Sequence, residues 1–249
     1  MIIIKNNKEI ARMRSAGKIV AETLLLVEEK VRPGITTAEL DRIAEEFITK
    51  HGAKPSFKGL YGFPASLCIS VNEQVVHGIP GGYVLKDGDI ISVDCGVHMN
   101  GFHGDAARTF GVGNITDEAK QLINVTKESF FKGIEYAKVG NRLTDISHGI
   151  QSYVEASGFS VVRDFVGHGI GRVVHEDPEV PNYGQPGRGP KLVEGMALAI
   201  EPMVNVGSYK VKTLKDNWTV VTSDGSLSAH YENTIVILPD GPEILTLIK

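Results

Sequence analysis

The sequence predicts an α+β protein that forms a single domain over residues 1–249. This domain consists of two similar halves, at about residues 1–113 and 114–249. Three observations predict this class. Apolar residues recur at helical spacing near the N-terminus, a run of β-branched residues with a hairpin signal follows, and the same order then repeats. The chain has 249 residues, of which 42% are apolar. A chain of this size buries enough surface to fold without disulfides or a structural metal.

The first predicted elements are two helices. Apolar residues from Ile10 to Val31 recur in alternating steps of three and four, so they share one helix face, and Pro33-Gly34 ends this helix. Thr36, with Glu39 three residues later, predicts the start of a second helix.

A strand region follows these helices. Residues 90–97 are rich in β-branched side chains, and Asn100-Gly101 predicts a two-residue hairpin turn. Such a turn places Gly96 opposite Asp105, so that Asp94 and Asp105 become diagonal neighbours on one face, ~7–8 Å apart. The predicted register therefore brings two carboxylates close enough to share a cation.

The second half repeats this order of elements. Helices are predicted over residues 117–137 and 143–157, and the shorter one aligns with its first-half counterpart at an offset of 106 residues. The strand regions align at an offset of 107 residues, which pairs Asp94 with Glu201. A buried carboxylate is costly unless it is neutralised. Either acid alone would more often be salt-bridged, but their symmetric placement favours a shared site where the halves meet.

Two further side chains extend this candidate site. Glu232 lies near the start of another predicted strand, residues 229–237, where the symmetry places a partner for Asp105. His168 lies in the glycine-rich segment 167–171 and would supply a fifth group.

Four carboxylates and one imidazole form a hard, oxygen-rich ligand set. Its charge suits two divalent ions rather than one, and such ion pairs, ~3.5–4 Å apart, activate water for hydrolysis. The two cysteines lack the spacing of a structural zinc site. Sites of this composition follow metal availability as much as affinity, so Co, Mn, Fe and Zn all remain open.

Five segments, taken together, resemble the methionine aminopeptidases of the bacterial type (type I). The matching text spans nearly the whole chain, and its most specific parts are residues 68–80, 101–105, 167–176, 200–204 and 231–234. The resemblance implies a metallo-exopeptidase with the pita-bread fold, a curved antiparallel sheet backed by two pairs of helices. It also implies a hydroxide activated by two divalent metal ions, with these ligands: Asp94, Asp105, His168, Glu201 and Glu232.

The resemblance further implies how substrate is held. His175 would face the oxyanion, His77 the scissile amide nitrogen, and Glu201 would relay the proton. Phe63, Cys68 and Trp218 match positions of the family's methionine pocket. Four positions depart from the family pattern and leave the pocket shape and the tolerated second residue open: Leu60, Tyr61, Phe63 and Val174.

The implied activity is removal of the initiator methionine from nascent polypeptides that carry a small second residue. The implied setting is a cytoplasmic monomer that acts on nascent N-termini, with the ribosome as an open question. A net charge of −4 argues against a protein held on nucleic acid by a general basic surface. No apolar run approaches the ~20 residues of a membrane helix.

Two alternatives remain at this point. An X-Pro dipeptidase or an aminopeptidase P-like hydrolase would share the five ligands, but these enzymes usually carry an additional N-terminal domain. A non-catalytic pita-bread binding protein would typically lack some ligands, whereas all five are present in this chain.

Overall fold

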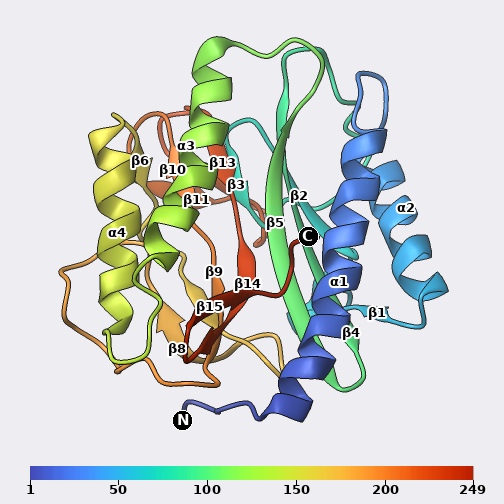
Figure 1. Cartoon of the computed structure of the whole chain (residues 1–249). Coiled ribbons are helices and arrows are strands. Elements are labelled where there is room, and N and C mark those ends of the chain that lie inside the picture. Colours follow the sequence, from blue (N-terminus) through green and yellow to red (C-terminus); the bar gives the residue numbers. More distant parts are fainter. Residues whose placement is uncertain (249) are drawn as a thin grey trace.

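The structure, a computed structural model, describes residues 1–248 and confirms the predicted α+β class (Figure 1). A short 3-10 turn, Leu60–Gly62, precedes the second strand. The α-helices are α1 (Asn7–Lys30), α2 (Thr37–Lys50), α3 (Asp117–Ile134) and α4 (Leu143–Ala156). The strands are β1 (Lys54–Pro55), β2 (Leu67–Val71), β3 (Gln74–Val76), β4 (Ile90–Met99), β5 (Phe102–Gly111), β6 (Ser160–Val161), β7 (Gly167–Gly169), β8 (Glu176–Val180), β9 (Ala197–Ile200), β10 (Met203–Asn205), β11 (Val211–Thr213), β12 (Val220–Thr222), β13 (Ser228–His230), β14 (Asn233–Leu238) and β15 (Gly241–Ile244).

The helix ends follow local chemistry. Asn6 caps α1 in a reciprocal capping box with Glu9, and the Thr36 side chain accepts a hydrogen bond from the Glu39 amide at the start of α2, where the sequence predicts a helix start. Helix α3 ends at Ile134, three residues before the predicted end at 137, and the chain continues as turns.

The hairpin of β4 and β5 has the predicted register. Asn100 and Gly101 have φ angles of 54° and 80°, as a two-residue turn of this type requires. Gly96 consequently lies opposite Asp105, and Asp94 lies opposite Ala107. The two acids therefore share one face of the hairpin.

The predicted single strand over residues 229–237 is wrong, because the chain divides there into β13 and β14. His230 pairs with Met203 in one sheet and Asn233 pairs with Ile200 in another. Both pairs follow the same antiparallel register, so Glu232 lies opposite Glu201 in the gap between them. Pro202, which has no amide N–H, lies in this gap, and its carbonyl oxygen accepts a bond from the Tyr231 amide.

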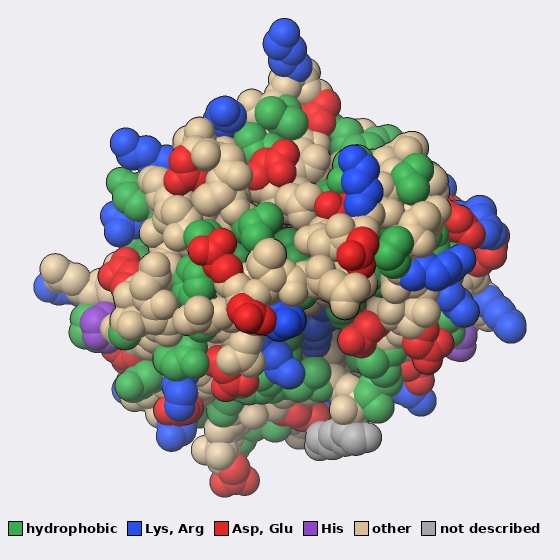
Figure 2. Space-filling model, turned by 90° about the horizontal axis from the view of Figure 1, so that it is seen from above, with side chains coloured by type: hydrophobic (Ala, Val, Ile, Leu, Met, Phe, Trp, Pro, Cys, Tyr) green, Lys and Arg blue, Asp and Glu red, His purple; other side chains and the backbone are tan. Residues whose placement is uncertain are grey.

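The helices lie outside the strands in two pairs (Figure 1). One buried cluster joins α1 and α2 to β2, β4 and β5, and another joins α3 and α4 to the strands of the second half. This arrangement is consistent with the predicted division of the chain into two similar halves. The boundary between the halves stays a prediction. In the described part of the chain, residues 1–248, no helix has the length and apolar character needed to cross a membrane. On the face drawn in Figure 2, acidic, basic and hydrophobic side chains are intermixed.

Helix α1 crosses β5 at two glycines, Gly17 in α1 and Gly104 in β5. A methyl group at Gly17 would overlap the carbonyl oxygen of Leu245, and one at Gly104 would meet the Gly17 backbone. We expect Gly17→Ala to lower the free energy of unfolding by about 1–3 kcal/mol, because the helix must move outward. Urea denaturation measures this change. Gly82→Ala is the matched control, since a methyl group there meets no atom within 4 Å, and equal losses in both variants would contradict the prediction.

Candidate metal centre

All ten side chains singled out from the sequence line one cavity of about 560 Å³. Its walls come from segments far apart in the sequence, including β2, β4, β5, β7 and the connection between β13 and β14. The ten residues are Phe63, Cys68, His77, Asp94, Asp105, His168, His175, Glu201, Trp218 and Glu232.

Backbone pairing brings the acids of the two halves together. The Glu232 amide donates to the Ala107 carbonyl oxygen at 3.0 Å, and the Ala107 amide donates to the Glu232 carbonyl oxygen at 3.3 Å. The hydroxyl of Thr234 bonds the amide and the carbonyl of Asp105, each at 2.9 Å. Strand β5 is thereby joined to the connection that carries Glu232, although these residues are more than a hundred positions apart.

His168 enters the cavity between two glycines of β7. Methyl groups at Gly167 and Gly169 would overlap the carbonyl oxygens of Ala199 and Asp177, so glycine allows the neighbouring strands to approach. The Nδ1 atom lies 2.9 Å from the Gly169 carbonyl oxygen. Because a carbonyl oxygen only accepts, Nδ1 carries the proton and Nε2 keeps its lone pair for a metal. Nε2 lies 3.7 Å from Oε1 of Glu201.

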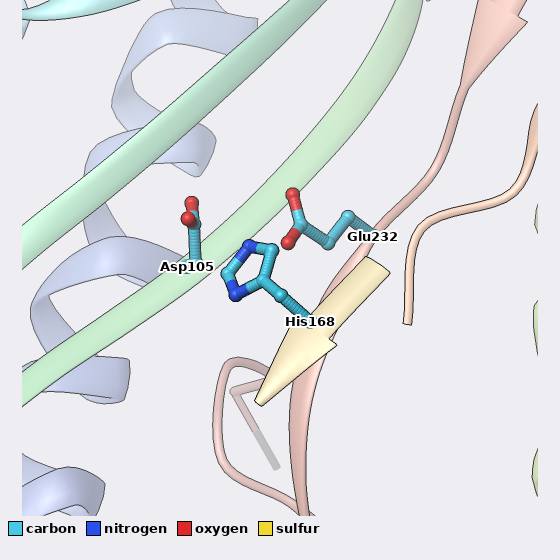
Figure 3. A group of neighbouring side chains, drawn as sticks. All are labelled: Asp105, His168 and Glu232. Atoms are coloured by element: carbon cyan, nitrogen blue, oxygen red, sulfur yellow. The ribbon is translucent and has the colours of Figure 1, made fainter. Parts of the chain in front are cut away.

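The ligand atoms of Asp105, His168 and Glu232 lie within 4.8 Å of one another, and the three side chains point toward one another (Figure 3). Asp105 and Glu232 are 3% and 2% exposed. Such a compact group of one imidazole and two buried carboxylates is typical of a divalent metal site.

Burial acts on all four carboxylates, and repulsion from neighbouring carboxylates acts on three of them, Asp105, Glu201 and Glu232. Burial raises the pKa of Asp94 to about 7. The pKa values of Asp105, Glu201 and Glu232 lie well above their usual range, first because of burial and then because of the neighbouring carboxylates. The four charges therefore require a positive counterpart to stay ionised near neutral pH.

The donor atoms fit a bound cation. One carboxylate oxygen each of Asp94, Asp105 and Glu232 is buried without a hydrogen-bond partner among residues 1–248. Buried acceptors normally have a partner, and a cation would supply it here. Carboxylate and imidazole donors suit Mn, Fe, Co and Zn alike.

His77 and His175 lie in the cavity beside this group. His77 has a φ of 58°, in the left-handed region that few residues other than glycine adopt, and such strain is common at functional sites. Burial lowers the pKa of His77 to about 4, and burial also lowers the pKa of His175. The His175 ring packs edge-on against the His168 ring, with centroids 4.5 Å apart.

An apolar pocket adjoins the two histidines. Phe63 and Trp218 meet edge to face with ring centroids 5.1 Å apart, and buried Cys68 belongs to the same cluster. Leu60, Phe63 and Val174 pack in this cluster, whereas Tyr61 is 75% exposed and stacks on the His175 ring with centroids 5.9 Å apart.

The structure adds residues that sequence reasoning missed. Phe57 and Phe165 line the cavity, and Phe165 packs edge-on against His77. Arg108 donates to the Glu232 carbonyl oxygen at 2.5 Å and to Oδ1 of Asn233 at 2.7 Å, and its guanidinium lies 4.3 Å from the centroid of the Tyr231 ring. The period of β5 could have assigned Arg108 to a face, but its partners lie about 125 residues away.

The chain is similar to known metallopeptidases over most or all of its length. The sequence pattern of metallopeptidase family M24 matches residues 11–239. A methionine aminopeptidase of Clostridium perfringens is 79% identical over 249 residues, which is all of both chains. A crystal structure of a methionine aminopeptidase from Thermotoga maritima superimposes with a TM-score of 0.98 at 49% identity and full coverage of both chains.

A more distant likeness concerns the fold alone. The prolidase of Pyrococcus horikoshii has a TM-score of 0.82 at 24% identity, and all of this chain covers 65% of that one. These likenesses confirm the predicted pita-bread fold. From the family match and the full-length relatives, the chain belongs to metallopeptidase family M24.

Proposed function

We propose that this protein removes N-terminal methionine from nascent polypeptides and peptides, and that it favours substrates with a small second residue. The observation that carries the proposal is one cavity that combines the cluster of four acids and an imidazole with an apolar pocket of Phe63, Cys68 and Trp218. Aromatic and thiol groups suit a methionine thioether. The full-length likeness to methionine aminopeptidases supports the same substrate.

We propose that two divalent ions are held by Asp94, Asp105, His168, Glu201 and Glu232. When bound, such ions supply Lewis acidity and a potent nucleophile from water near neutral pH. Asp105 and Glu232, which are 3% and 2% exposed and point toward His168 in Figure 3, would each be shared by the two ions.

The residues of the chain divide the remaining work. As water adds to the carbonyl carbon of the first peptide bond, Glu201 takes a proton from it and delivers that proton to the leaving amide nitrogen. His175 donates a hydrogen bond to the carbonyl oxygen as negative charge develops there, and His77 holds the scissile nitrogen. The C–N bond then breaks, giving free methionine and a shortened chain with a new amino terminus.

The decisive test is metal-dependent methionine release. The protein is stripped of metal, and Mn²⁺, Co²⁺, Fe²⁺ or Zn²⁺ is restored separately. We expect release from Met-Ala-Ser, weaker release from Met-Leu-Ser, and no cleavage of Ala-Pro. Absence of methionine release with every ion would overturn the proposal, and cleavage of Ala-Pro alone would assign the site to X-Pro hydrolysis.

Metal binding is also expected to stabilise the fold. A ligand that binds only the native state adds about 2.7 kcal/mol at a hundredfold excess over its Kd, or about 5–10 °C in Tm for a chain of this size. Differential scanning fluorimetry of the stripped protein, with and without Mn²⁺, measures this shift. A Tm independent of Mn²⁺ would contradict it, and Mg²⁺, which prefers sites that keep several waters, serves as the comparison ion.

A further inference from the structure

A second cavity, of about 550 Å³, lies between α1, β5, α3 and the last described residues. Figure 1 shows β5 passing between these two helices, one from each half of the chain. The cavity shares no lining residue with the metal cavity. Its volume is within the range of small-molecule sites.

Most of its wall is aliphatic or aromatic. Side chains from α1, β5, α3 and the C-terminal segment contribute: Leu24, Leu25, Phe110, Ile123, Leu247 and Ile248. Leu25 and Ile248 are 48% and 50% exposed, so apolar surface reaches solvent. The wall therefore favours a ligand with a hydrocarbon portion.

Arg108 supplies a cationic group to this wall. Arg108 forms no salt bridge with a carboxylate of residues 1–248, and its hydrogen bonds run from the two Nη atoms to oxygens of Ala107, Glu232, Asn233 and Thr246. Its Nε–H makes no hydrogen bond within the described residues.

The other charges in the wall cancel formally. Glu28 and Lys127 both line the cavity and carry opposite charges. Among the acidic and basic side chains of residues 1–248 that line the cavity, Glu28, Lys127 and Arg108, the excess charge is therefore positive. Guanidinium groups pair with carboxylates more strongly than with neutral acceptors.

We propose that this second cavity binds an unbranched aliphatic monocarboxylate, with its carboxylate at Arg108 and its hydrocarbon chain among the apolar side chains of α1, α3 and the C-terminal segment. The charge of Arg108 and the apolar wall both contribute to binding, so a ligand with only a carboxylate or only a hydrocarbon chain binds weakly. The proposal does not depend on the activity of the metal cavity, because the two cavities have separate walls.

Isothermal titration calorimetry with octanoate tests this proposal. The metal-loaded protein is first saturated with free methionine, so that the probe does not report on the metal cavity. We expect one octanoate per chain, bound at least tenfold more tightly than acetate, which lacks the chain, and 1-octanol, which lacks the charge. Absence of octanoate binding, or equal affinity for 1-octanol, would overturn the proposal.

A pair of matched variants locates the probe. Leu25→Trp fills the mouth of the cavity and is expected to weaken octanoate binding at least tenfold. Val139→Trp makes a similar change at a residue that is likewise 48% exposed and lies outside the cavity, so binding there is expected to stay unchanged. Unaltered binding by a folded Leu25→Trp protein would show that octanoate binds elsewhere, which also overturns the proposal.

Discussion

Glu232→Gln is expected to lower metal-dependent methionine release by more than ~100-fold. Loss of a residue that merely orients a ligand already costs about 10–100-fold in metal affinity or activity. Glu232 is itself proposed to bind both ions, and its side chain is 2% exposed, so water has little room to replace it. Mass spectrometry measures the loss of bound metal, and methionine release from Met-Ala-Ser measures the loss of activity.

The same substitution is expected to stabilise the metal-free protein. Repulsion from Glu201 and Asp94 contributes to the raised pKa of Glu232, and the amide removes this charge at almost constant volume. We expect a gain of about 1 kcal/mol, or about 2–4 °C in Tm, at a pH where the carboxylates ionise. Glu179→Gln is the matched control, since Glu179 lines the same cavity but is exposed. A Glu232→Gln protein that keeps both ions and full turnover would refute the ligand assignment.

His175→Ala is expected to separate metal binding from turnover. The proposed role of His175 is a hydrogen bond to the developing oxyanion, and removal of one such donor typically costs about 10²–10³ in kcat. Because His175 is not a proposed ligand, the variant should hold nearly its full metal content. The loss should fall mainly on kcat, since the interaction strengthens in the transition state.

The structure makes one control necessary. The His175 ring packs on the His168 ring, so alanine also removes a neighbour of a proposed ligand. His175→Gln keeps much of this packing and should show the same loss of turnover. His148→Ala, on the exposed side of α4, should change neither quantity. Loss of metal from both His175 variants would mean that this residue belongs to the metal centre.

The first-half acids could be placed from sequence because their geometry is local. A two-residue Asn-Gly turn has one strong register, and side chains alternate with a period of two along each strand. The predicted pairing of Gly96 with Asp105 is therefore found in the structure. The split between β13 and β14 could not be predicted in this way, because it depends on pairing with a separate segment interrupted by Pro202.

Arg108 and Phe165 show a second limit of the sequence. A basic residue in a strand is usually predicted to face solvent. Arg108 instead contacts the Tyr231 ring and donates a hydrogen bond to the Glu232 carbonyl oxygen. Phe165 has no feature that distinguishes it from a core residue, yet its ring packs on His77. Both roles arise from contacts between segments far apart in the chain.

The sequence by itself determined the start of α2, the β4–β5 turn and the placement of Asp94 and Asp105 on one face, because capping, turn geometry and strand periodicity act over a few residues. The tertiary structure alone decided that these groups meet. Glu232 reaches Asp105 only because its backbone pairs with Ala107, and His168 reaches them only because Gly167 and Gly169 let neighbouring strands close around β7. Convergence of charges from distant segments depends on packing of the whole chain, which no local pattern encodes.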